Sequence, residues 1–76
     1  MSSSADSLKL DAIGLKCPQP LLLLRTAMRD HALTRTFEVA ADDPLAHVDL
    51  AAFCARFGHD YQRSADGSLH WIKRKA

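Results

Sequence analysis

Several residue types are scarce in this sequence, and each shortage excludes a class of protein. Two cysteines in 76 residues are too few for the dense disulfide framework of many small secreted domains. Aromatic residues make up only 7% of the chain, which leaves no clear platform for stacking nucleic-acid bases. No apolar run approaches a membrane span, and a net charge of +1 gives no global attraction to polyanions or membrane surfaces. We therefore expect a cytoplasmic protein with reduced thiols and no membrane partner.

The chain is short but ordinary in composition, with 47% hydrophobic and 25% charged residues. These values predict one globular domain with a modest core. Residues 1–7 are polar and lack the apolar segment of a signal peptide, so we interpret them as a flexible tail. The domain itself is expected to span residues 8–76.

The hydrophobic pattern predicts the element order βαβαββ. It indicates strands at residues 8–13, 36–41, 60–64 and 68–73, and helices at residues 21–31 and 45–57. A strand, a helix and another strand predict a parallel crossover, and the Asp66-Gly67 pair predicts a hairpin between the last two strands. We expect an α+β fold in which both helices pack on one face of a four-stranded mixed sheet.

Apolar residues at helical spacing predict the buried face of each helix. The predicted stripes are Leu21, Leu24, Ala27 and Met28 in the first helix, and Leu50, Phe53, Cys54 and Phe57 in the second. Cys54 is therefore interpreted as a buried, inert thiol. Gly58 follows the second stripe and is expected to end that helix in a left-handed conformation.

The segment at residues 14–20 joins the first strand to the leucine-rich helix and contains a cysteine followed by two prolines. Proline favours the first helical position, because its fixed φ suits a helix and its missing N–H would be unpaired there. This preference places Pro18 at the first helical position and Cys17 at the N-cap. Pro20 then lies at the third position, where it breaks no internal helix bond.

Several physical effects would make a thiol at a helix start reactive. The positive end of the helix dipole, the N–H of Gln19 and the charge of Lys16 would stabilise a Cys17 thiolate and lower its pKa. Serine, threonine, aspartate and asparagine are better N-caps, so stability alone does not explain a cysteine here. The alternative is a small apolar residue at an ordinary helix start. The predicted site consists of Cys17 with the supporting residues Gly14, Lys16, Pro18, Gln19 and Pro20.

Other groups of polar residues give weaker signals. The pair Asp42-Asp43 suggests metal binding or acid–base work, but a turn and a helix cap explain it better, with Asp43 as N-cap and Pro44 at the first helical position. The histidines and cysteines are scattered without Cys-x-x-Cys or His-x-x-x-His spacing, so we predict neither a zinc site nor a thioredoxin-like pair. There is no phosphate loop or dinucleotide fingerprint, and no cofactor is predicted.

The chain also resembles the TusA/SirA-like sulfur-carrier family, whose members share a Cys-Pro-x-Pro motif. Four blocks carry the resemblance in order, at residues 10–20, 41–54, 58–60 and 72–75. The resemblance implies a two-layer α/β sandwich in which Cys17 carries sulfur as a persulfide, without a bound cofactor. It implies a cysteine desulfurase or other sulfurtransferase as donor, and an acceptor protein in tRNA thiolation, molybdenum-cofactor assembly or sulfur oxidation. Such a relay acts stoichiometrically with its partner enzymes.

The sequence leaves a second function class open. Lys73, Arg74 and Lys75 form a basic run, which we interpret as a solvated chain end or as a docking patch for an acidic partner or RNA. Under this alternative the protein is a regulatory or RNA-binding α/β module without thiol chemistry. The low aromatic content counts against it, and we expect no direct contact with nucleic acid.

Overall fold

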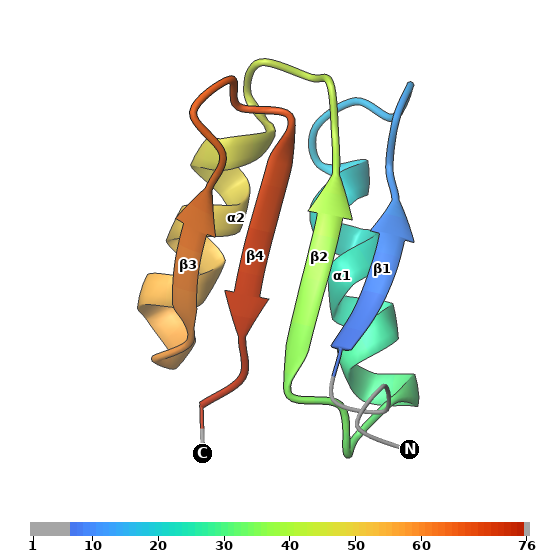
Figure 1. The fold of residues 1–76 in the computed structure, drawn as a ribbon, viewed down its shortest axis with the longest axis vertical. Coiled ribbons are helices and arrows are strands. Elements are labelled where there is room, and N and C mark those ends of the chain that lie inside the picture. Colours follow the sequence, from blue (N-terminus) through green and yellow to red (C-terminus); the bar gives the residue numbers. More distant parts are fainter. Residues whose placement is uncertain (1–6, 76) are drawn as a thin grey trace.

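Six elements follow one another in the predicted order in the computed structural model, which describes residues 7–75 (Figure 1). The strands are β1 (Ser7–Asp11), β2 (Thr36–Ala40), β3 (Asp60–Arg63) and β4 (Leu69–Lys73), and the helices are α1 (Gln19–Asp30) and α2 (Ala46–Phe57). Residues 1–6 of the predicted tail lie outside the described residues, whereas Ser7 already belongs to β1. Among residues 7–75, no helix combines the length and apolar content needed to cross a membrane.

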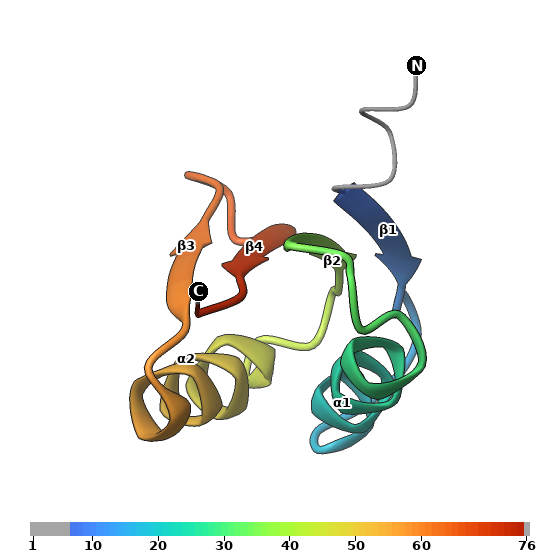
Figure 2. The ribbon, with the colours of Figure 1, turned by 90° about the horizontal axis from the view of Figure 1, so that it is seen from below.

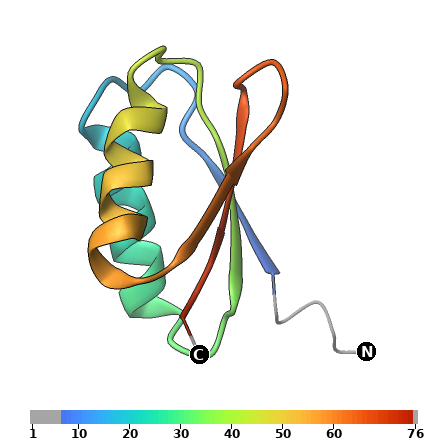
Figure 3. The same cartoon turned by 90° about the vertical axis from the view of Figure 1, so that its left-hand side faces the viewer.

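The four strands form one mixed sheet in the order β1-β2-β4-β3. Strands β1 and β2 are parallel, and β4 is antiparallel to both β2 and β3. Both helices cover the same face of this sheet, and its other face is left uncovered (Figures 2 and 3). The predicted fold class and layer arrangement are therefore confirmed.

The core lies between the sheet and the two helices, and most predicted stripe residues are in it. Side chains alternate across a strand, so Phe37 and Val39 of β2, with Ala41 just beyond it, all face the helices and are buried. The helices bury Leu24, Ala27, Met28, Leu50 and Cys54 against them. Phe57 is an exception to the predicted stripe, because 49% of it is exposed. It is the last residue of α2, and its ring lies against Phe53 and under the Arg56 guanidinium instead of against the sheet.

The C-terminal end of α2 is as predicted, whereas its N-terminal end differs. Gly58 adopts φ 78° and its N–H donates to the Cys54 carbonyl, which confirms the left-handed C-cap. The N-cap, however, is Leu45, so the assignment of Asp43 as N-cap with Pro44 at the first helical position is wrong. Asp43 accepts the N–H of Leu45 through Oδ1 at 3.1 Å, so its carboxylate forms the turn before the helix.

Candidate functional site

The predicted cysteine lies in the loop between β1 and α1, where its side chain is exposed. Because β1 and β2 are parallel, the loops that follow them leave the sheet at the same edge (Figure 1). The loop after β2 contains Asp42 and Asp43, and it leads into α2. The topology therefore brings these aspartates close to Cys17 although they are far from it in the sequence.

Carboxylates of the second loop hold the backbone of the first. Asp42 Oδ1 accepts the N–H of Gly14 at 3.0 Å, and Asp43 Oδ2 accepts the N–H of Cys17 at 2.6 Å. The bonds from the N–H groups of Cys17 and Leu45, together with the charge of Lys16, hold the pKa of Asp43 below its ordinary value. Asp43 is thus an ionised bridge between the cysteine loop and the start of α2. The sequence pattern indicated only a turn and a cap at this position.

A third carboxylate controls the thiol itself. The Cys17 thiol donates a hydrogen bond to Asp49 Oδ2, from the first turn of α2. This hydrogen bond, partial desolvation and the negative charges of Asp49 and Asp43 raise the pKa of Cys17 above its ordinary value. The prediction of a lowered pKa is therefore wrong for the free protein, in which Cys17 rests as a protonated thiol.

The start of α1 differs by one residue from the prediction. The helix begins at Gln19, Pro18 is the N-cap and Pro20 is the second helical residue, so Cys17 precedes the N-cap. The N–H of Gln19 donates to the Lys16 carbonyl at 2.7 Å, and it is not free to stabilise the sulfur as predicted. Gly14 has φ 84°, a left-handed conformation that favours glycine and lets the chain turn toward α1.

The second cysteine lies in a different environment. Cys54 is 1% exposed, and burial, with the charge of Asp60, raises its pKa to about 11. The predicted burial of Cys54 is therefore confirmed, and its raised pKa is consistent with a thiol that is a poor nucleophile at neutral pH. Within residues 7–75, no three His, Cys, Asp or Glu side chains are grouped as metal ligands.

The C-terminal basic run is only partly solvated. The Arg74 guanidinium donates to the carbonyls of Thr34, Met28 and His31 at 2.9–3.0 Å, and it lies 5.4 Å from the centre of the Phe37 ring. Met28 is in the last turn of α1 and His31 is its C-cap, so the guanidinium binds carbonyls at that helix end. Because of this structural role, the Arg74 guanidinium is not a free member of the docking patch for an acidic partner or RNA that the sequence left open.

Substitution of Asp49 tests its control of the thiol. Asp49→Asn keeps the shape of the side chain but removes the negative charge and the strongest acceptor for the thiol proton. We expect the pKa of Cys17 to fall and its alkylation by iodoacetamide at pH 7 to become several-fold faster, because more thiolate is present. The pH–rate profile should move to lower pH. Asp30→Asn, at the far end of α1, is the matched control, and equal rates in both variants would contradict the role of Asp49.

The comparisons with known proteins agree with one another. A family model described as "Sulfurtransferase TusA" matches residues 8–74. A protein named "Sulfur carrier protein TusA" from Pseudomonas aeruginosa strain LESB58 is 39% identical over 79 residues, covering 100% of this chain and 99% of the relative. The protein of the same name from Pseudomonas putida strain W619 is 40% identical over 70 residues, covering 88% of each chain. Among solved structures, a SirA-like protein from Desulfitobacterium hafniense has the same fold, with a TM-score of 0.71, 19% identity and coverage of 91% of this chain and 99% of that one.

Proposed function

Because the chain belongs to the TusA sulfurtransferase family and works in sulfur relay, we propose that Cys17 holds the transferred sulfur atom as a persulfide. The observation that carries this proposal is the contrast between the two thiols. Cys17 is exposed in the loop between β1 and α1, where another protein can reach it. Cys54 is buried, and its raised pKa keeps it protonated.

The proposed step exchanges one sulfur–sulfur bond for another. The sulfur of Cys17 attacks the outer sulfur of a persulfide on the donor protein and forms a new S–S bond. The old S–S bond breaks, and the donor cysteine leaves as a thiolate that takes up the proton lost by Cys17. The products are a Cys17 persulfide and a donor thiol, so no oxidant or reductant is consumed.

Asp49 gives the carrier a resting state. Its carboxylate holds the free Cys17 as a thiol, and only thiolates attack disulfides and oxidants at useful rates. The exposed sulfur is therefore protected while no partner is bound. The bridge from Asp43 to the Cys17 N–H meanwhile holds the loop in place for an incoming donor.

The partners follow from the same chemistry. We propose a cysteine desulfurase or another sulfurtransferase as the donor, since both present a persulfide. The acceptor is a downstream protein of tRNA thiolation, molybdenum-cofactor assembly or sulfur oxidation. A carrier with an exposed free thiol suits a reducing compartment, and we propose the cytoplasm as its location.

Intact-mass spectrometry tests the site of loading. After incubation with a cysteine desulfurase and cysteine, we expect the wild-type protein to gain the mass of one sulfur atom and to lose it on reduction. Cys54→Ser should gain the same mass to the same extent, because the buried thiol takes no part. A gain that disappears in Cys54→Ser would contradict the assignment to Cys17, as would no gain with any of several sulfur donors.

A further inference from the structure

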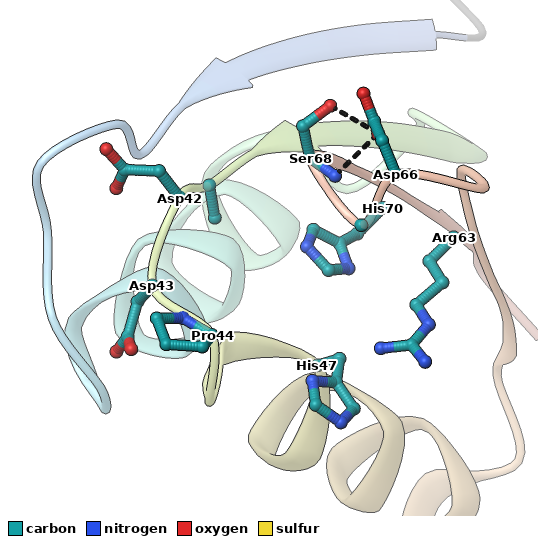
Figure 4. A pocket seen from close by; sticks show the side chains of 10 residues that line it. Asp42, Asp43, Pro44, His47, Arg63, Asp66, Ser68 and His70 are labelled. Atoms are coloured by element: carbon teal, nitrogen blue, oxygen red, sulfur yellow. Dashed lines mark hydrogen bonds between the residues drawn. The ribbon is translucent and has the colours of Figure 1, made fainter.

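A hollow lies beside the Cys17 site, between the start of α2 and the β3–β4 hairpin (Figure 4). It has a volume of about 420 Å³, and neither cysteine lines it. Its wall on the side of the cysteine loop is formed by Asp42 and Asp43, and its other walls include His47, Arg63 and His70. The sulfur relay proposed above uses none of these last three residues.

His70 has an unpaired polar atom at this hollow. The residue is 1% exposed, and its Nδ1 lies 2.8 Å from the Tyr61 hydroxyl, while its Nε2 has no hydrogen-bond partner among the described residues. Figure 4 shows the ring directed into the hollow. Burial raises the pKa of Tyr61, so its hydroxyl remains protonated and able to donate to Nδ1. In that arrangement Nε2 carries the imidazole hydrogen and presents it to the hollow.

Two further basic side chains are directed at the same space. Arg63 pairs with His70 across β3 and β4, so both side chains lie on the sheet face that carries the helices. His47 lies in the first turn of α2, and all three residues line the same hollow (Figure 4). In the part of the chain that the structure describes, Arg63 forms no salt bridge. The hollow thus contains a guanidinium without a carboxylate partner.

The carboxylates that line the hollow accept hydrogen bonds from other groups of the protein. Asp66 Oδ1 accepts three hydrogen bonds from Ser64 and Ser68, and Asp42 and Asp43 bind the cysteine loop. Figure 4 shows Asp42, Asp43 and Asp66 turned away from the imidazoles. Burial lowers the pKa of His70 and nearby Arg63 and His47 lower it further, whereas a hydrogen bond with the Gly67 backbone raises it. Arg63 is therefore the permanent positive charge that acts on the buried imidazole, while the negative carboxylates of the wall are held by hydrogen bonds to other groups.

We propose that this hollow binds a small tetrahedral oxyanion of the phosphate or sulfate class. One oxygen of the anion accepts the Nε2–H of His70, and the Arg63 guanidinium neutralises the charge with two further donors in a fork. His47 closes the side next to α2, where the helix dipole also favours an anion. The site does not depend on the sulfur chemistry of Cys17, so its test is independent of the sulfur-carrier proposal.

Nuclear magnetic resonance with inorganic phosphate tests the proposal directly. We expect the imidazole nitrogens of His70 to show Nε2 protonated in the free protein. Phosphate and sulfate, added at constant ionic strength against chloride, should shift the Nε2 signal and the Ser68 amide along saturating curves. Arg63→Gln should weaken phosphate binding about tenfold, because one charge-assisted interaction is lost. Arg35→Gln removes the same charge from an exposed arginine outside the hollow and should leave the affinity unchanged.

Three results would overturn the proposal. An unprotonated Nε2 in the free protein would remove the donor on which the site depends. Shifts that do not saturate, or that are equal for phosphate and chloride, would show that the hollow holds only water. Equal loss of affinity in Arg63→Gln and Arg35→Gln would show a general charge effect instead of a site.

Discussion

Cys17→Ser is expected to abolish sulfur loading and onward transfer completely, the largest functional effect of any single change in this chain. Serine has no sulfur with which to form a persulfide, and its hydroxyl is not ionised at neutral pH. Cys54 cannot replace it, because that thiol is 1% exposed and its pKa is raised to about 11. The measurement is transfer of radiolabelled sulfur from donor to carrier and from carrier to acceptor, with the variant at the concentration of the wild type.

The same substitution should leave the fold intact, which separates lost chemistry from lost structure. Cys17 is exposed, and a serine hydroxyl can donate to Asp49 as the thiol does. We therefore expect an unchanged melting temperature and circular dichroism spectrum. Residual loading of Cys17→Ser that disappears in the double variant with Cys54→Ser would place the sulfur on Cys54 and overturn the assignment.

The fold was predictable because its signals are local and repeated along the chain. The alternation of buried residues in β2 and the helical spacing of apolar residues around Leu24 and Leu50 define one buried face in each element. A sheet with both helices on one side buries all three faces together. The hairpin turn is likewise supported by Gly67, which adopts φ 79°. Phe57 was wrongly predicted to be buried, because the spacing of apolar residues does not show where the sheet stops covering a helix.

The environment of Cys17 was less predictable, because it depends on residues distant in sequence. Asp43 is 26 residues and Asp49 is 32 residues from Cys17, and only the parallel pairing of β1 and β2 brings them together. The motif at residues 14–20 indicates a helix start and, from local electrostatics, a lowered pKa. The hydrogen bond from the Cys17 thiol to Asp49, with desolvation and the charge of that carboxylate, reverses the sign of that shift. The position of Asp49 in the first turn of α2 gives no separate signal in the sequence.

This reversal changes what the motif is understood to do. A helix start with a cation nearby suggests a permanently activated thiolate. In the structure, however, the Cys17 thiol donates to Asp49 and the backbone N–H of Cys17 donates to Asp43. Before a donor binds, a carrier has to keep its free cysteine from reacting with disulfides and oxidants. A thiol that is exposed but held protonated meets this requirement better than a free thiolate.

Phe37→Ala is expected to have the largest effect on stability. Phe37 is fully buried in β2, which is paired on both sides, and Arg74 lies over its ring. Truncation of a buried phenylalanine costs about 3–5 kcal/mol, while a domain of this size is stable by roughly 0.05–0.15 kcal/mol per residue. We expect the melting temperature to fall by more than about 10 °C, measured by circular dichroism or calorimetry.

Leu33→Ala is the matched control, because it also truncates a large apolar side chain but at a residue that is 90% exposed. Its melting temperature should stay close to that of the wild type, since little apolar surface returns to water. Equal losses in the two variants would contradict the assignment of the core to the space between β2 and the helices. Phe37 lies near the start of β2, whereas the cysteine loop follows the opposite end of β1. At a temperature where Phe37→Ala is still folded, sulfur loading per folded molecule should therefore equal that of the wild type. A variant that is unstable but chemically competent would show that Phe37 stabilises the fold without taking part in the transfer.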